Sequence, residues 1–368
     1  HNVAHSFPTR RSSDLNLIQV DGPRTDVTDT VAYAYDAERR VTQTTDALGK
    51  LTKQAYDADG RLVRSAAQIG TQWLVSCRSY TNSGKLFMAW GPGQTAADIT
   101  CPTTVAPVAV DYYLYDDLDR PLWNLTAADG DMRISETVYN ADDSVASVKR
   151  AVGTAQEQTY AAYTYTPNGL PATVKDAKNN LTTYQYDGHD RKVKTLYPDK
   201  VTANTSSTND YEQYGYDNND NIVSLRRRNG QTIYLHYDNL NRLLARNYPN
   251  SADNVSYSYD LLGRRLAANY DANPSYNVSY AWDNAGRLTS TNVGYKTLAY
   301  EYDPAGNRTR LYWPEGGFYV TTTYDALNRP TAIKEMGYTN LATYAYDDLS
   351  RRTTVRGRRK RSEEHTSE

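Results

Sequence analysis

Large apolar side chains are scarce in this sequence, and phenylalanine is nearly absent. The 368 residues include 3 Phe and 3 Met, against 34 Tyr. A conventional core of large hydrocarbon side chains is therefore not expected. Intrinsic disorder is the usual alternative for so polar a chain, but disorder goes with few aromatic residues and high net charge, and both conditions fail here. The sequence thus predicts a folded protein that packs amphipathic aromatic rings.

An excess of charge of either sign is also missing. The 41 Lys and Arg residues nearly balance the 43 Asp and Glu residues, so the formal net charge is -2. A nucleic-acid-binding protein needs a basic surplus to neutralise phosphates, so no nucleic-acid partner is expected. The basic run Arg356–Arg361 stands at one end of the sequence and is interpreted as accidental. No natural start is visible, so the lack of a signal peptide or membrane anchor in this window says nothing about export; we expect no membrane insertion in this segment.

Cysteine is limited to Cys77 and Cys101. The two residues could close one disulfide if the protein is exported to an oxidising compartment. Two lone cysteines at this spacing also fit unpaired, structural roles. Both alternatives stay open from the sequence.

The two ends of the chain are interpreted as translated sequencing-adapter DNA. The residues HSFPTRRSSDL, from His5 to Leu15, and RSEEHTSE, from Arg361 to Glu368, can each be encoded by a common adapter. Segments of this kind are set aside before the fold is considered. We therefore expect residues 1–15 and 361–368 to be disordered and a repeat array to occupy residues 16–360, as an internal piece of a longer reading frame.

One phrase recurs along the chain: an aromatic residue, Asp, two variable residues, then Gly, Asn or Asp, and usually Arg. Most neighbouring copies start about 20 to 24 residues apart, which is a period typical of repeat architectures. The copies on which the prediction rests are Tyr56, Asp57, Gly60 and Arg61; Tyr186 and Asp187; Tyr259, Asp260, Gly263 and Arg264; Trp282, Asp283, Gly286 and Arg287; and Tyr302, Asp303 and Gly306. Degenerate copies begin at Tyr80, Tyr139 and Tyr165.

The phrase is typical of a hairpin turn. An Asp in the first turn position can accept hydrogen bonds from backbone amides two or three residues on, which stabilises a type I turn. The fifth residue must pass through left-handed backbone geometry, which Gly, Asn and Asp tolerate. Arg39 occupies this position in the first copy, so that turn is expected to be longer or strained.

Strands are expected on both sides of each turn. Aromatic residues two apart precede it, as at Tyr257 and Tyr259, and residues two apart share one face of a strand. Each repeat is thus about one β-hairpin, and successive hairpins can pair edge to edge. The preference for Tyr over Phe suits a single curved sheet with a wide, polar interior, where a ring packs sideways while its hydroxyl reaches water or a neighbour. We predict an all-β fold, a continuous spiralling sheet that forms part of a hollow shell.

With these phrases in place, the chain resembles the Rhs/YD-repeat family, which includes bacterial Rhs proteins, components of insecticidal Tc toxins and animal teneurins. The resemblance implies a β-sheet shell that surrounds a variable C-terminal toxin in the bacterial members, which are secreted or displayed at the cell surface. The partners it implies are that toxin cargo and a secretion apparatus. A less regular insert at about residues 73–110, with Trp90-Gly91-Pro92-Gly93, is similar to interruptions within such shells.

Catalysis is not expected within this segment. Toxin-bearing family members have a self-cleavage site with paired Asp-Pro motifs, whereas this chain has only Asp303-Pro304-Ala305-Gly306, in register as an ordinary turn. His189 and His236 have no partner histidine at metal-ligand spacing, so no catalytic residue, metal site or cofactor is predicted. The alternative function is a carbohydrate-binding or adhesive surface module, because Tyr-rich polar sheets suit stacking on sugars.

Overall fold

The computed structural model describes residues 9–11, 16–98, 100–103 and 108–357 of the chain. Within these residues 30 strands form one sheet, and helix is limited to two single-turn 3-10 helices, η1 (Ser251–Asp253) and η2 (Pro274–Tyr276). The prediction of an all-β fold is confirmed. In the same part of the chain, no helix has the length and apolar character needed to cross a bilayer.

The strands follow one another along the chain with short connections. They are β1 (Thr9–Arg11), β2 (Leu17–Val20), β3 (Val31–Tyr35), β4 (Val41–Thr45), β5 (Leu51–Tyr56), β6 (Leu62–Ile69), β7 (Gln72–Tyr80), β8 (Leu86–Thr95), β9 (Val110–Tyr115), β10 (Pro121–Ala128), β11 (Asp131–Tyr139), β12 (Val145–Arg150), β13 (Gln158–Tyr165), β14 (Pro171–Asp176), β15 (Leu181–Tyr186), β16 (Lys192–Pro198), β17 (Ser206–Tyr216), β18 (Ile222–Arg226), β19 (Thr232–Tyr237), β20 (Leu243–Asn247), β21 (Val255–Tyr259), β22 (Arg265–Tyr270), β23 (Val278–Trp282), β24 (Leu288–Val293), β25 (Lys296–Tyr302), β26 (Arg308–Tyr312), β27 (Tyr319–Tyr324), β28 (Pro330–Glu335), β29 (Thr339–Tyr346) and β30 (Arg352–Gly357).

Each strand pairs antiparallel with the next strand in the chain, so the sheet is one continuous ribbon of hairpins. The repeat phrases join each odd-numbered strand, from β3 onward, to the strand after it. Because consecutive strands run in opposite directions, these turns all lie along one edge of the ribbon, which we call the turn rim. The connections from even-numbered to odd-numbered strands lie along the other edge, the loop rim.

The repeat turns have the geometry that their residues predict. In the turn at Asp57, the N–H of Gly60 donates to the carbonyl of Asp57 at 3.1 Å, and the N–H of Asp57 donates to the carbonyl of Arg61 at 3.0 Å. Gly60 has a φ of 80°. This is a type I turn followed by a left-handed residue, and the pairing register shifts by one at the end of β5. The turn at Arg39 has the same length, so a longer turn there is wrong; Arg39 itself adopts a φ of 65°.

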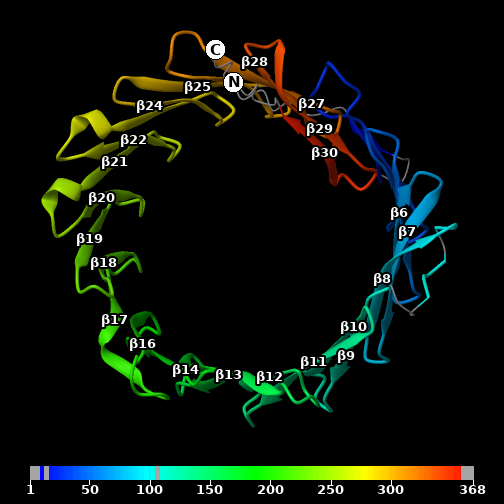
Figure 1. Cartoon of the computed structure of the whole chain (residues 1–368), viewed down its shortest axis with the longest axis horizontal. Coiled ribbons are helices and arrows are strands. Elements are labelled where there is room, and N and C mark those ends of the chain that lie inside the picture. The colour runs from blue at the N-terminus through cyan, green and yellow to red at the C-terminus, as the bar shows by residue number, and fades with distance from the viewer. Residues whose placement is uncertain (1–8, 12–15, 99, 104–107, 358–368) are drawn as a thin grey trace, which may run out of the picture.

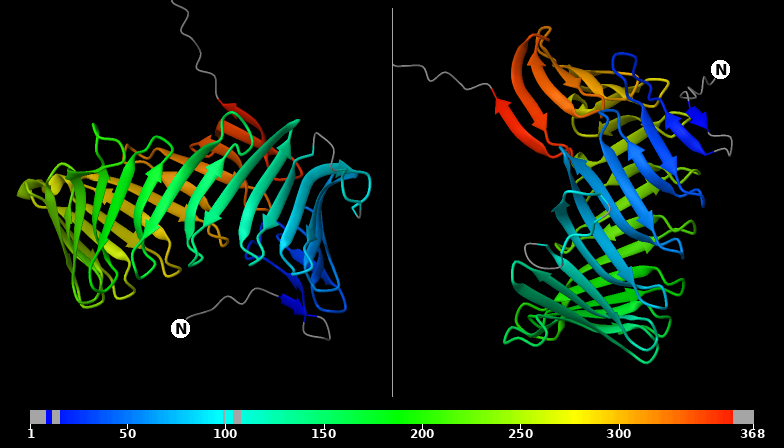
Figure 2. Two further views of the ribbon diagram at one scale, coloured as in Figure 1. Left: turned by 90° about the horizontal axis from the view of Figure 1, so that it is seen from below. Right: turned by 90° about the vertical axis from the view of Figure 1, so that its right-hand side faces the viewer.

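The ribbon curves around a circle, and no described element lies at its centre (Figure 1). After one circuit the last strands pass beside the first. Figure 2 shows the orange and red strands near the C-terminus next to the blue strands near the N-terminus. Five hydrogen bonds and ion pairs cross between the two layers, and they join residues 278 to 301 positions apart in the chain. The sheet is therefore a spiral of slightly more than one turn.

The contacts between the layers form a seam in which the turn rim of the last strands meets the loop rim of the first. Arg24, in the loop before β3, donates from Nη1 to the carbonyl of Asp325 at 2.6 Å, and its Nε lies 3.8 Å from Oδ2 of Asp303. The Nζ of Lys50 lies 2.8 Å from Oδ1 of Asp348, whose Oδ2 accepts the N–H of Gly70 at 2.6 Å. The seam is polar and runs along three consecutive repeat turns.

Among the described residues, few apolar side chains are buried, and the cluster that they form lies in β6 and β7. Ala66, Val75 and Cys77 are buried there, with Trp73 and Trp90 packed against them. A disulfide joins Cys77 to Cys101, with the two Cα atoms 5.9 Å apart. The disulfide ties the irregular connection after β8 to strand β7.

The less regular insert is smaller than the sequence suggested. Residues 72–95 form the paired strands β7 and β8, and the irregular stretch within the described residues is confined to residues 96–98, 100–103 and 108–109. The Nε1 of Trp90 anchors this stretch by donating to the carbonyl of Pro102 at 2.9 Å.

The two terminal segments lie mostly outside the described residues. Residues 1–8, 12–15 and 361–368, for which the sequence predicts disorder, lie outside the described residues. For Thr9–Arg11 the prediction is wrong, because these residues form β1 and pair with β2. The unpaired edge of β2 offers free backbone groups, which explains why a short adjacent segment adds a strand there.

Candidate functional site

The turn rim is the feature that the sequence singled out, and all of the predicted repeat residues lie on it. They occupy the turns after β5, β15, β21, β23 and β25, in the order Tyr56, Asp57, Gly60 and Arg61; Tyr186 and Asp187; Tyr259, Asp260, Gly263 and Arg264; Trp282, Asp283, Gly286 and Arg287; and Tyr302, Asp303 and Gly306. The structure brings the last three of these turns together as neighbours. The rim is thus a ladder of like turns along one edge of the sheet.

The aspartate of each turn binds the backbone of its own turn. Oδ1 of Asp57 accepts hydrogen bonds from the N–H groups of Asp59 at 3.0 Å and Arg61 at 2.9 Å. Oδ2 accepts from Nε of Arg61 at 2.7 Å. The amides lie two and four residues on, whereas the sequence pointed to two and three. The carboxylate therefore satisfies donors that the turn leaves free and also holds the arginine in position.

The same three bonds recur around the rim. They are made by Asp116, Asp187, Asp238, Asp260, Asp325 and Asp347. At Asp187 the hydrogen bond from the Arg191 side chain is the largest influence and lowers the pKa of the carboxyl from 3.8 to about 2. Folding thus favours the ionised form of the Asp187 carboxyl.

The arginine of each turn reaches forward to the next turn. Nη1 of Arg264 donates to the carbonyl of Asp283 at 2.9 Å, and Nη1 of Arg287 donates to the carbonyl of Asp303 at 2.8 Å. The guanidinium of Arg287 also lies 5.1 Å from the ring centroid of Tyr302, close enough for a cation–π contact. One arginine therefore belongs to two turns and couples neighbouring hairpins.

The aromatic residue of each turn reaches back to the preceding hairpin. In 13 of the repeat turns its polar hydrogen is donated to a backbone carbonyl at 2.6 to 3.0 Å, and the acceptor is the first residue of the preceding return strand. The pairs are Tyr35 with Leu17, Tyr56 with Val41, Tyr80 with Leu62, Tyr115 with Leu86, Tyr139 with Pro121, Tyr165 with Val145, Tyr186 with Pro171, Tyr216 with Lys192, Tyr259 with Leu243, Trp282 with Arg265, Tyr302 with Leu288, Tyr324 with Arg308 and Tyr346 with Pro330. Phenylalanine could not make this bond.

Substitutions within the ladder keep its chemistry. Trp282 replaces Tyr and donates from its indole Nε1 to the carbonyl of Arg265 at 2.9 Å. Asn307 replaces Arg, and its amide donates to Oδ2 of Asp303 at 2.8 Å and to Oδ1 of Asn328, in the next turn, at 2.7 Å. Asn307 thus supplies, as arginine does, a donor that reaches both its own aspartate and the next turn.

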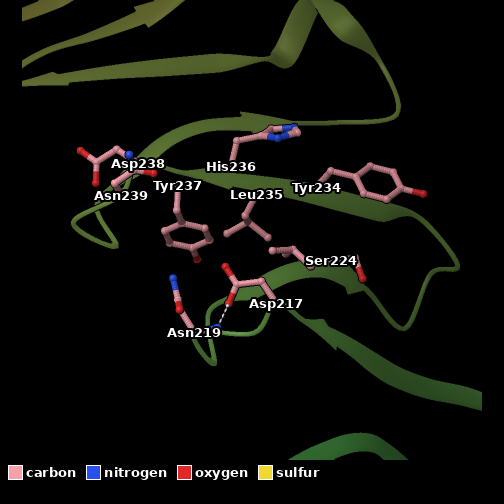
Figure 3. A pocket seen from close by; sticks show the side chains of 10 residues that line it. Asp217, Asn219, Ser224, Tyr234, Leu235, His236, Tyr237, Asp238 and Asn239 are labelled. Carbon is pink, nitrogen blue, oxygen red and sulfur yellow. Dashed lines mark hydrogen bonds between the residues drawn. The ribbon is translucent and has the colours of Figure 1, made fainter.

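Tyr237 departs from the ladder, because its hydroxyl makes no such bond to the preceding hairpin. Its ring points toward the turn that holds Asp217 and Asn219 (Figure 3). The ring lines a depression of about 570 Å³, together with Leu235 and Ser224. Burial raises the pKa of Tyr237 above 10.0. This depression is a gap in the ladder.

The side chains that could carry out chemistry are dispersed. Among the described residues, no group of three or more His, Cys, Asp and Glu is placed to hold a metal ion. His189 lies in a repeat turn, and His236, in β19, contacts the amide of Asn247 at 3.2 Å. Asp303-Pro304-Ala305-Gly306 forms a repeat turn, in which the N–H of Gly306 donates to Asp303 at 3.0 Å. The ladder thus shows the bonding of a structural element.

The links between hairpins are what sequence analysis missed. It placed the turn residues but assigned the tyrosine hydroxyl only to water or an unnamed neighbour, and the arginine to no partner. Two signals were present: the ratio of 34 Tyr to 3 Phe, and the replacement of Tyr by Trp282, the other large ring with a hydrogen-bond donor. Both indicate that the donor matters as much as the ring.

Comparison with known proteins points to one family. A model of the RHS repeat family matches residues 165–202. The structure of a Tc holotoxin pore from Photorhabdus luminescens aligns with 94% of this chain and 23% of that chain, with a TM-score of 0.58 and 14% sequence identity. A crystal structure of TcdB2-TccC3-TEV aligns with 96% of this chain and 25% of that chain, at a TM-score of 0.49 and 12% identity. No curated protein matches the sequence. The likeness to the holotoxin concerns the fold, and this chain spans about a quarter of each structure's length.

Proposed function

We propose that this chain, which matches an RHS repeat model at residues 165–202 and whose strands form one continuous sheet, is a non-catalytic wall segment of a secreted hollow container. In the whole protein the container encloses a C-terminal toxin cargo. Together with a secretion apparatus, it helps to deliver that cargo in bacterial competition or virulence. The Tc holotoxin found by comparison is a toxin assembly with the same fold, which supports this proposal.

The observation that carries the proposal is the return of the sheet to itself. Arg24 and Lys50 contact residues about 300 positions later, so the ribbon closes a circuit with no described element at its centre. A wall that seals against its own next turn is suited to enclosing something. A flat or open adhesive surface would not need the seam.

The aromatic residues of the turn rim are already bonded within the sheet, which supports a structural role over carbohydrate binding. A sugar-binding platform needs ring faces and polar groups that are free for the ligand. In this ladder the hydroxyl of Tyr302 is bonded to Leu288, and Arg287 lies 5.1 Å from its ring centroid. The same two contacts recur at Tyr259 and Tyr346. These rings hold hairpins together.

Limited proteolysis of the intact parent protein tests the proposal. We expect a C-terminal fragment that survives protease while the wall is folded and is digested once the wall is unfolded by urea. The matched control is the same C-terminal segment expressed alone, which should be digested quickly. If the segment is cleaved equally fast inside the parent, it is not enclosed, and binding of the parent to a glycan array would then favour the adhesive alternative.

A further inference from the structure

A short segment after β8 forms a second layer over one face of the sheet. We call residues 96–98 and 100–103 the strap. Three contacts hold the strap to β5, β7 and β8: the ion pair of Asp98 with Lys53, the disulfide of Cys101 with Cys77, and the hydrogen bond from Nε1 of Trp90 to the carbonyl of Pro102 at 2.9 Å. The connection that contains the strap lies on the outer side of the ring, where Figure 1 shows it in cyan.

The strap covers the apolar cluster of β6 and β7. Val75 and Cys77 are 0% and 1% exposed, and they are the largest fully buried side chains among the described residues. Pro102 is also buried, and it lies so close to Gly93 that any side chain at that position would clash with it. A single sheet buries a face only where another layer lies on it. The burial of this cluster therefore depends on the strap.

The strands beneath the strap also reach the seam. Ala66 of β6 is paired with Val75 of β7. The turn between the two strands contains Gly70, whose N–H donates to Oδ2 of Asp348 in the other layer at 2.6 Å. The apolar cluster and this contact across the seam thus belong to one hairpin. Because a hairpin opens as a unit, looser packing between β6 and β7 also weakens the hold on the Gly70 amide.

We propose that the Cys77–Cys101 disulfide is a redox switch for the seam. While the disulfide is intact, the strap stays on the sheet and the β6–β7 hairpin stays bonded to Asp348. Reduction releases the strap, uncovers the apolar cluster and opens this end of the seam. A wall that passes from an oxidising to a reducing compartment would open there after the transfer. The inference concerns the wall itself, so it goes beyond the enclosure of a cargo and does not depend on it.

The remaining contacts of the strap are too weak to replace the disulfide. The side chains of Lys53 and Asp98 are 37% and 18% exposed, and a partly exposed ion pair contributes little to stability. The bond from Trp90 to Pro102 is a single neutral hydrogen bond, whose net contribution is modest. The covalent link is therefore what decides whether the strap stays in place.

The chemistry of release is thiol–disulfide exchange with a low-molecular-weight thiol. A thiolate of the reductant attacks Sγ of Cys101, since Cys101 is exposed whereas Cys77 is buried. The bond between the two sulfurs breaks, its electron pair stays on Sγ of Cys77, and that sulfur takes a proton. A second thiolate of the reductant then attacks the mixed disulfide, so that Cys101 also becomes a thiol and the reductant leaves as a disulfide.

Hydrogen exchange of the full chain, before and after treatment with dithiothreitol, tests the proposal. The Gly70 amide reports the seam, the amides of Cys101 and Thr103 report the strap, and those of β19 serve as a reference. We expect the Gly70 amide to exchange at least about tenfold faster after reduction, because the loss of a disulfide shifts a local opening equilibrium by at least that much. Labelling of the two cysteines with a thiol reagent checks that the disulfide has been reduced.

Two variants serve as controls. Cys77→Ala combined with Cys101→Ala should give fast exchange at Gly70 with and without dithiothreitol, which excludes an effect of the reductant elsewhere. Asp348→Ala removes the acceptor of the Gly70 amide, so exchange there should be fast in both redox states.

Two results would overturn the proposal. One is a reduced chain in which the strap amides exchange faster while the Gly70 amide keeps its oxidised rate, since the strap would then be independent of the seam. The other is a disulfide that dithiothreitol does not reduce while the chain is folded.

Discussion

The hydroxyl of Tyr259 offers the sharpest test of how the hairpins are held together. It donates to the carbonyl of Leu243 at 2.9 Å, across the boundary between two repeats. Tyr259→Phe keeps the ring and removes only that donor. A net contribution of about 1 kcal/mol is typical for such a bond, and the substitution also leaves the partly buried carbonyl of Leu243 without this donor. We therefore expect the local stability of β20 to β22 to fall by about 1 kcal/mol.

The assay has to be local, because a repeat array is stabilised by terms between neighbours and need not unfold in one step. Native-state hydrogen exchange of the amides in β20, β21 and β22 reports the opening free energy of these hairpins directly. Urea unfolding followed by circular dichroism gives the accompanying change in the free energy of unfolding of the whole array. Distant strands such as β10 should be unaffected.

Two further variants distinguish the effect of losing the hydrogen bond from the effect of removing a hydroxyl oxygen. Tyr257→Phe is the matched control, since Tyr257 lies on the same strand and its contact is the guanidinium of Arg265, 4.6 Å from the ring centroid. It should leave exchange nearly unchanged. Tyr259→Trp should recover part of the loss, because Trp282 makes the equivalent bond with its indole nitrogen. If the two Phe variants lose equal stability, the hydrogen bond between repeats is not what links the hairpins.

Three other perturbations follow from the structure. Arg39→Gly should stabilise the chain by up to about 1 kcal/mol in urea unfolding, because Arg39 has a φ of 65° that costs a side-chain-bearing residue more than glycine; a destabilised variant would contradict this. Acid should weaken the turn rim, since the pKa of Asp187 is about 2 when folded and 3.8 ordinarily: the unfolded chain binds the proton more tightly, so this stabilisation is full above about pH 4 and is lost as the pH falls toward 2. NMR titration of the Asp187 carboxyl checks the value, and a midpoint near 3.8 would contradict it. Reduction of the Cys77–Cys101 disulfide, which closes a loop with a sequence separation of 24, should cost about 3 kcal/mol and speed exchange in residues 96–98 and 100–103, whereas exchange in β19 to β30 should not change.

The repeat unit could be predicted from the sequence because everything that defines it is local. The aspartate, the left-handed position and the arginine stand within six residues, and each has a conformational preference that does not depend on the rest of the protein. The alternation before Tyr259 likewise follows from the period of a strand. For this reason even the degenerate copies could be placed: the turn at Thr166 has the same pair of backbone bonds as the turn at Asp57.

The partners across repeats depended on the pairing of strands, which a pattern within one repeat does not contain. The sequence showed that Tyr302 and Trp282 are preferred over Phe, but the acceptors Leu288 and Arg265 are identified only when hairpins lie in register. The insert was overestimated for a similar reason. Its one repeat phrase, at Tyr80, is degenerate, yet β7 and β8 pair because the edge of β6 is there to extend.

Ring closure was decided by the tertiary structure alone. Arg24 meets Asp325 because a small curvature at every hairpin adds up over a whole circuit. The sequence of the loop around Arg24 does not specify this accumulated curvature. The pairing of Cys77 with Cys101, which the sequence left open, was settled by the fold of the connection after β8. The sequence by itself determined the hairpin, because turns and strands are governed by neighbouring residues. The accumulated curvature of the sheet determined which distant residues meet.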